Sequence, residues 1–293
     1  MATSVRISNS SSSSSSRATS LASQLEALEG VKIHPFTEIT NLQEIVDAQI
    51  EELQSWESDQ QFVIFDHVTE AVLDEIDHER EHGRVAKCTR MTHYTDTNLL
   101  IIKLMPSVPH EEAHLCLAGE LPLRAQAMGV HKRELRPVGA GRFRGNSSSK
   151  EGDSAYKPRS TRIRNTYWPT IVFEAGLSES LGQLRLDANW WLINSEGDVK
   201  IVVIISLQKA LSRVSIEKWE LTPSNPARPR TRANQETPTR VQEITINPNN
   251  VTGAPLVLGF QNIFLRPATT PETNFIFTAQ ELSTFATDIW VGL

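Results

Sequence analysis

Two acidic residues, Asp153 and Glu174, stand beside segments whose patterns predict strand ends. Asp153 belongs to the segment GDSAYKP (152–158), and Glu174 belongs to WPTIVFEAG (168–176). The apolar run before Glu174 predicts a buried strand that ends at this carboxylate. Two carboxylates on adjacent strand ends suit a hard divalent ion such as Mg²⁺ or Mn²⁺, which prefers oxygen ligands. The pair therefore predicts a metal site.

The elements around Glu174 predict a strand–helix–strand unit. Residues 170–175 form the first expected strand, and residues 178–193 carry apolar side chains at helical spacing. The β-branched run KIVVIISL (200–207) predicts a second strand. Such a unit places both strands parallel and central in an α/β sheet. Ligands bind at the carboxyl edge of open α/β sheets, where Glu174 is expected to lie.

Several short motifs follow one another in an order that resembles the PD-(D/E)XK superfamily, the restriction-endonuclease-like fold. The sequence is similar in particular to a group of fungal proteins, and the similarity covers about residues 85–210. The matching elements are Asp153 with Tyr156-Lys157-Pro158, Trp168-Pro169-Thr170, Val172-Phe173-Glu174, Ser178-Glu179-Ser180 and Trp190-Trp191. The resemblance implies an α/β fold with a mixed sheet flanked by helices.

The resemblance also implies a role for each site residue. Asp153 would be the first acid of the motif and Glu174 the second, while Glu111 or Glu112 would add an acid from a helix over 109–129. The lysine expected two residues after the second acid is replaced by Gly176. Arg185 is the first candidate to supply the missing positive charge, and Lys157 is the second.

The implied function is Mg²⁺-dependent hydrolysis of phosphodiester bonds in nucleic acid, DNA or RNA. Arginine can clamp a phosphate but cannot readily act as a base, which leaves a second hypothesis open. In that alternative the chain is a catalytically inactive binding or regulatory protein on the same fold.

A third hypothesis comes from His110-Glu111-Glu112-Ala113-His114, which fits the H-E-x-x-H pattern of zinc peptidases. On a helix this spacing can bring both histidines to one zinc ion. The pattern is short, no further histidine follows at the expected spacing, and a third ligand has no pattern support. Initiation of the helix after Pro109 is the favoured interpretation.

Charge is unevenly distributed along the chain. Residues 38–81 contain 14 acidic residues against one basic residue, whereas residues 130–165 contain ten Lys or Arg against three acids. The basic stretch predicts contacts with a nucleic-acid backbone through Arg142, Arg144 and Lys150. A solvated face, or an internal pairing with the acidic segment, is the alternative.

The pair Trp190-Trp191 could stack on nucleobases, but the helical spacing favours Trp191 in the core and Trp190 at its boundary.

The chain divides into five expected parts. A Ser-rich disordered tail (1–25) precedes an acidic helical extension (26–84), the α/β core (85–220), a Pro/Arg-rich linker (221–240) and C-terminal strands and helix (241–293). Thr278 and Glu281 predict a capping box for the last helix. With two cysteines, no secretory signal and no apolar run of membrane length, we expect an intracellular protein, cytoplasmic or nuclear.

Overall fold

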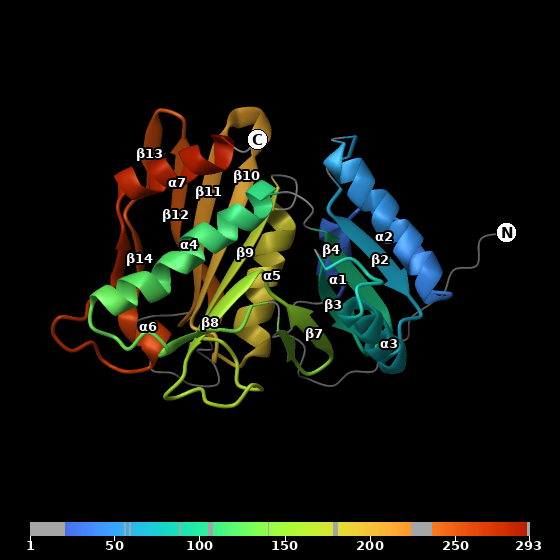
Figure 1. Ribbon diagram of the computed structural model, residues 1–293, viewed down its shortest axis with the longest axis horizontal. Helices are drawn as coiled ribbons and strands as arrows, with labels where there is room; N and C mark the ends of the chain where they lie inside the picture. The colour runs from blue at the N-terminus through green and yellow to red at the C-terminus, as the bar shows by residue number, and fades with distance from the viewer. Residues whose placement is uncertain are drawn as a thin grey trace.

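Two large sheets, set side by side, carry most of the strands in this protein (Figure 1). The computed structural model describes residues 21–55, 57–58, 60–87, 89–104, 108–139, 141–177, 181–223 and 236–291. These residues form a mixed α/β fold in which helices flank mixed sheets, as the sequence predicts.

The first sheet has six strands and belongs mostly to the N-terminal part of the chain. Its order is β1 (Ile33–Pro35), β2 (Phe62–Asp66), β4 (Leu99–Leu104), β3 (Thr89–Tyr94), β7 (Ser148–Glu151) and β6 (Arg142–Arg144). Helices α2 (Ile39–Gln54) and α3 (Glu70–Glu81) pack on one face through Leu42, Val46 and Leu73. Helix α1 (Leu21–Ala27) packs on a separate apolar cluster that includes Ile64 and Ile101.

The second sheet has seven strands and contains the expected strand–helix–strand unit. Its order is β13 (Asn250–Thr252), β12 (Glu236–Asn247), β11 (Arg213–Pro223), β10 (Ile201–Gln208), β9 (Ile171–Leu177), β8 (Ser154–Pro158) and β5 (Leu135–Pro137). Strands β9 and β10 pair in parallel and are joined by helix α5 (Leu181–Asn194). This confirms the predicted parallel pair, while the expected start of the helix, at 178–180, lies outside the described residues.

Alternate side chains of β9 face two different cores. Ile171, Phe173 and Ala175 join the cluster that packs against helix α4 (Val108–Ala127). Val172 joins the cluster formed with α5. Because strand side chains alternate between faces, Glu174 is directed to the α5 face with Val172. Figure 1 shows α4 and α5 on either side of this sheet.

The C-terminal elements extend the second sheet's core on the α4 side. They comprise β14 (Leu256–Leu258), α6 (Phe260–Phe264), β15 (Phe275–Phe277) and α7 (Ala279–Val291). Earlier in the chain, a short 3₁₀ turn, η2 (Lys209–Leu211), connects β10 to β11. Helix α7 lies along α4. Thr278 and Glu281 form the predicted capping box at the start of α7.

Two predicted segments need correction. The N-terminal extension is not purely helical, because β1 and β2 lie within it and pair with the β3–β4 hairpin. The expected linker 221–240 is largely strand in its described part: β11 and β12 pair from Pro223 with Glu236 onward. The prolines in this segment predicted a linker, but a long two-stranded ribbon can include proline at edge positions. Residues 224–235 lie outside the described residues.

The basic stretch 130–165 contains the two short strands β6 and β7 of the first sheet. These short strands extend the first sheet. The sequence did not predict them because their small polar residues lack a β pattern. No helix among the described residues is long and apolar enough to cross a membrane.

Candidate metal and catalytic site

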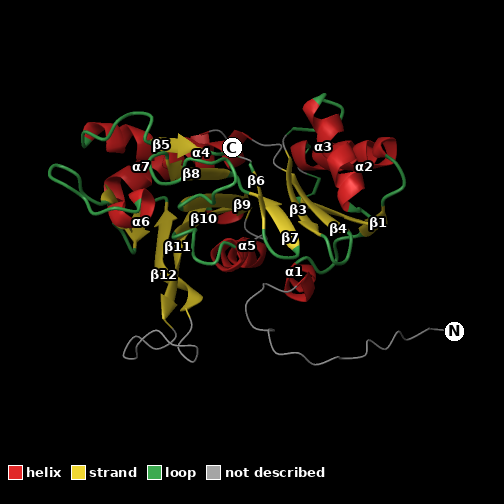
Figure 2. Ribbon diagram, turned by 90° about the horizontal axis from the view of Figure 1, so that it is seen from below, coloured by secondary structure: helices red, strands yellow, loops and turns green. Residues whose placement is uncertain are grey.

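The chain passes from the first sheet to the second at Gly152 and Asp153, between β7 and β8 (Figure 2). Tight packing favours glycine at this crossover. A Cβ on Gly152 would lie 3.0 Å from the Trp191 ring and 3.3 Å from Val172. The close approach holds the backbone against α5 and β9, so that Asp153 is fixed at the junction between the two sheets.

The carboxylate of Asp153 is buried and makes hydrogen bonds to both sheets. Its Oδ2 atom accepts hydrogen bonds from the Lys103 ammonium and from the Ala175 backbone N–H, each at 2.8 Å. Its Oδ1 atom is buried without a hydrogen-bond partner, and Arg90 Nε lies 3.9 Å from it. One oxygen is thus fixed by donors while the other keeps unused acceptor capacity.

Glu174 lies beside Asp153 on the neighbouring strand. Ser154 of β8 pairs with Phe173 of β9 in an antiparallel register, so the next positions along the ladder are Asp153 and Glu174. The Glu174 carboxylate is buried and accepts a 2.6 Å hydrogen bond from Trp191 Nε1. The structure therefore brings together the two acids that the sequence singled out.

A lysine that the sequence analysis did not single out lies between these acids. The Lys103 ammonium is 2.8 Å from Asp153 Oδ2 and 3.7 Å from Glu174 Oε2, and it donates a 2.6 Å hydrogen bond to the Ala175 carbonyl. Lys103 comes from β4 in the first sheet, 50 residues before Asp153. The one available signal was a lysine within the apolar run LLIIKL (99–104), since a charge inside such a run needs a buried partner.

The electrostatics of this pair differ between the two acids. Burial raises the pKa of Asp153, but the positive groups around it, Lys103 foremost, together outweigh burial and hold that pKa far below its usual range. Burial, and then the charge of Asp153, raise the pKa of Glu174 to about 7. At neutral pH Asp153 is therefore ionised, and Glu174 is close to the midpoint of its titration.

A second buried lysine, Lys150, lies in the same interior. Its ammonium is 2.9 Å from the Asp187 carboxylate of α5 and donates a 3.2 Å hydrogen bond to Thr92. Burial opposes its charge, but Asp187 and Glu174 together raise its pKa. Lys150 is therefore a charge of the protein interior. The prediction that it contacts a nucleic-acid backbone is wrong, because its side chain is buried against Asp187.

The two cations proposed from the sequence lie elsewhere. Arg185 donates a 2.6 Å hydrogen bond to Glu217 of β11. Lys157 is fully buried, and its ammonium donates to the carbonyls of Arg164, Asn165 and Tyr167 at 2.7–3.0 Å. Both therefore have structural partners, and neither is in contact with the acid pair. Lys103 is instead a cation in contact with both acids.

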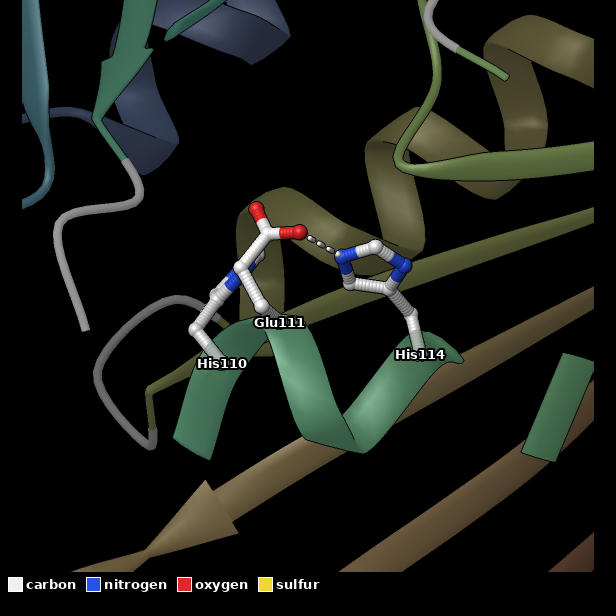
Figure 3. A group of neighbouring side chains, drawn as sticks. All are labelled: His110, Glu111 and His114. Atoms are coloured by element: carbon white, nitrogen blue, oxygen red, sulfur yellow. Dashed lines mark ion pairs between the residues drawn. The ribbon is translucent and has the colours of Figure 1, made fainter. Parts of the chain in front are cut away.

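Glu111 and Glu112, the predicted sources of a third acid for the site, contact other groups. Glu111 Oε2 lies 3.4 Å from His114 Nε2, one turn along α4 (Figure 3). Glu112 instead lines a groove between α4 and α7 with Cys116. The helix does approach the acids through His110, whose Nε2 is 2.9 Å from the Ala175 carbonyl and 3.8 Å from Asp153. Burial lowers the pKa of His110 to about 4, so its imidazole is neutral at pH 7.

The predicted surface arginines differ in exposure. Arg142 is held by Asp77 at 2.9 Å and by Glu151 at 2.9 Å, and it is mostly covered. Arg144 is 70% exposed and lies 3.5 Å from Glu70. Because Asp77 and Glu70 belong to α3, the acidic segment pairs internally with part of the basic stretch. Of the three predicted contacts, Arg144 alone presents its charge to solvent.

Both tryptophans of α5 are completely buried. Trp190 donates a 2.9 Å hydrogen bond to Ser148, so it is a core residue rather than a boundary residue. The two indoles pack edge to face with ring centroids 5.1 Å apart. Trp191 supports the acid pair through its hydrogen bond to Glu174, and neither indole can stack on a nucleobase.

Comparison with known proteins gives little guidance. No family model matches the chain, and no curated protein matches it in sequence. Among solved structures, the chain is similar to one described as a "putative nuclease belonging to DUF820" from Anabaena variabilis, with 12% identity and a TM-score of 0.39. The match covers 67% of this chain and 90% of that chain. A similarity at this level does not establish a shared activity.

Proposed function

We propose that the chain is a metal-dependent nuclease-like protein whose reaction centre is formed by Asp153, Glu174 and Lys103. The observation that carries the proposal is the meeting of two buried carboxylates from neighbouring positions of β8 and β9 at one buried ammonium. Buried ionisable groups with strongly shifted pKa values are typical of functional sites, although structural ion pairs also produce them.

The charge balance of the interior favours a bound cation. Three buried carboxylates, those of Asp153, Glu174 and Asp187, face two buried ammonium groups, those of Lys103 and Lys150. Burial first, and then the charge of Asp153, raise the pKa of Glu174, so that its carboxylate holds a proton more readily than an exposed one. A divalent ion would replace the proton on Glu174 and would use the free acceptor atom of Asp153.

The donor set is suitable for Mg²⁺ or Mn²⁺. Asp153 and Glu174 offer carboxylate oxygens, which these hard ions prefer. When bound, such an ion supplies an activated water and stabilises charge on a phosphate. The residues of the chain contribute the rest. Lys103 supplies a fixed positive charge for the phosphate, and Glu174, with its pKa near neutrality, can exchange a proton at working pH.

The substrate we propose is nucleic acid, DNA or RNA, held through its phosphates. Arg144 is the candidate contact on the surface, since its guanidinium is exposed on β6 of the first sheet. Contacts of this kind position a backbone without reading sequence.

The test is a cleavage assay of purified full-length protein on supercoiled plasmid, single-stranded DNA and RNA, with Mg²⁺ or Mn²⁺. Asp153→Asn and Glu174→Gln should abolish metal-dependent cleavage because each removes an ion ligand. Lys103→Met should reduce the rate by about 10²–10³-fold, the usual effect of removing one charge-stabilising donor.

The matched control is Arg185→Gln, which alters a cation that is paired with Glu217 and does not contact the acids. It should retain wild-type cleavage. Thermal unfolding of each variant separates loss of function from loss of folding. Equal background cleavage by wild type and Asp153→Asn with both metals and all three substrates would contradict the enzyme proposal.

A second candidate function is supported by the burial of the same acids. Asp153 is 3% exposed and Glu174 is 1% exposed, and each is already paired with groups of the protein. A site closed in this way in solution would leave the ion pair as a structural connection between the sheets. The chain would then bind nucleic acid or another partner without cleaving it, and salt-sensitive binding without turnover would support this alternative.

A further inference from the structure

Three side chains in the first turns of α4 form a second cluster beside the acid pair: His110, Glu111 and His114, called here the α4 cluster. Each offers a ligand atom within 4.8 Å of the others. Residues four apart on a helix share one face, which brings the two imidazoles together. Their ring centroids are 5.6 Å apart (Figure 3).

The hydrogen bonds of the two histidines leave one nitrogen unused on each ring. His110 engages the Ala175 carbonyl through Nε2 at 2.9 Å, and His114 engages Ser154 Oγ through Nδ1 at 2.8 Å. Of the remaining nitrogens, His110 Nδ1 is buried without a hydrogen-bond partner, and His114 Nε2 is buried with the Glu111 carboxylate 3.4 Å away. A buried polar atom without a partner is costly, so His110 Nδ1 requires an explanation.

Metal-binding histidines show this same division of roles. The nitrogen away from the ion is held by a carbonyl, a carboxylate or a similar group, which fixes the ring and its tautomer. The Ala175 carbonyl and the Ser154 hydroxyl fill those positions here. Glu111 supplies a carboxylate 3.4 Å from His114 Nε2, and its side chain is 39% exposed, so the cluster has a route to solvent.

We propose that the α4 cluster binds one divalent transition-metal ion of the Zn²⁺ type, through the free imidazole nitrogens of His110 and His114 and the carboxylate of Glu111. Two imidazoles and one carboxylate are a donor set that zinc accepts, with metal–ligand distances of about 2.0–2.2 Å. The ligand atoms must draw closer than they lie here, and the half-exposed Glu111 side chain can supply that movement.

This site differs from that of an H-E-x-x-H zinc peptidase. In that motif the glutamate acts as the general base, and a third ligand comes from another part of the chain. Among the described residues, the cluster that could hold a metal takes Glu111 itself as its third member. The glutamate would thus be a ligand, and the proposal requires neither peptidase activity nor activity of the acid pair.

The experiment is a titration of the chelator-treated full-length protein with ZnCl₂ by calorimetry, supported by the visible spectrum with Co²⁺. Wild type should bind one Zn²⁺ at this cluster. Glu111→Gln and His114→Gln should each weaken binding at least about 10-fold, and Ser154→Ala should weaken it by about 10–100-fold, as loss of a group that orients a ligand does. The Co²⁺ absorption should change with the same variants.

Two controls locate the ion. Glu112→Gln alters the neighbouring acid, which faces the α4–α7 groove, and it should bind Zn²⁺ as wild type does. Glu174→Gln alters the acid pair and should also retain Zn²⁺ binding, so failure of the nuclease proposal leaves this result unaffected. Glu111 is partly exposed, so Glu111→Gln should fold even where a histidine variant does not. No Zn²⁺ binding by wild type, or wild-type affinity in Glu111→Gln, would overturn the proposal.

Discussion

Lys103 and Asp153 join the two sheets of this protein through a buried ion pair, with Nζ and Oδ2 2.8 Å apart. Lys103 comes from β4 of one sheet, and Asp153 opens β8 of the other. Both side chains are shielded from solvent, so the attraction between their charges is weakly screened. The contact therefore bears on stability as well as on the proposed chemistry.

Lys103→Met should destabilise the fold by about 3–5 kcal/mol, because it leaves the Asp153 carboxylate buried without its main counter-charge. Urea unfolding followed by circular dichroism measures this change. Lys87→Met, at an exposed position, should alter stability by less than about 0.5 kcal/mol. The double variant Lys103→Met with Asp153→Asn should recover part of the loss. An equal loss in the single and double variants would show that the charge pairing is not responsible.

The pH dependence of stability should reveal the raised pKa of Glu174. Its folded-state pKa of about 7 exceeds the ordinary value of 4.5, so the folded protein holds a proton that the unfolded chain has released. The stabilisation is present in full below about pH 4.5 and is lost as pH rises through 7. Glu174→Gln should remove this component, so the stability of wild type relative to the variant should fall between pH 4.5 and 8 in chelator-treated protein. Parallel curves would contradict the assigned shift.

Only part of the candidate site could be predicted from the sequence, because its residues come from two sheets. Asp153 follows a turn, and Glu174 lies in a strand with a clear apolar pattern. The expectation that this strand ends at Glu174 is wrong, because β9 continues to Leu177 and Glu174 lies inside it. The parallel β9–β10 pair followed from hydrophobic periodicity. Lys103 could not be assigned in this way, since its position depends on how β4 meets the β7–β8 crossover. Charge spacing along the chain likewise could not show that Lys150 points inward to Asp187.

Lys157 illustrates a motif residue with a structural role. Its ammonium is hydrogen-bonded to three backbone carbonyls of residues 164–167, which fixes the loop that leads into β9. Lys157→Met should leave those carbonyls without a donor and destabilise the fold by at least about 1–3 kcal/mol. Hydrogen exchange should be faster in the variant than in wild type, and this increase should be larger in residues 160–170 than in α7. Unchanged exchange in that loop, with a loss of cleavage instead, would return Lys157 to the list of catalytic candidates.

Binding of nucleic acid should depend on Arg144 more than on Arg142. Arg144 is exposed, whereas Arg142 is engaged by Asp77 and Glu151. Arg144→Gln should weaken binding to a generic single strand and reduce the salt slope of log K by about one, as expected when one phosphate contact is lost. Arg142→Gln should mainly lower the melting temperature. Fluorescence anisotropy at several salt concentrations gives both slopes, and an unchanged slope in Arg144→Gln would place the contact elsewhere.

The start of α7 offers a test of an element that the sequence predicted in detail. Thr278 Oγ1 accepts a 3.3 Å hydrogen bond from the Glu281 backbone N–H, and Glu281 accepts a 2.7 Å hydrogen bond from the Thr278 backbone N–H. That backbone hydrogen bond, the Thr278 hydroxyl and Arg124 together lower the pKa of Glu281 to about 2. Thr278→Ala should cost about 1 kcal/mol of stability, the usual effect of losing a helix cap.

The same box should show the opposite pH dependence to Glu174. Because the folded-state pKa of Glu281 lies below its ordinary value of 4.5, its stabilisation is present above about pH 4.5 and is lost as pH falls toward 2. Comparison of wild type with Glu281→Gln by thermal unfolding from pH 6 to pH 2.5 measures this loss. The two melting temperatures should converge as the pH falls, because protonation makes the wild-type side chain neutral too. A constant difference across that range would show that the carboxylate charge does not stabilise the cap.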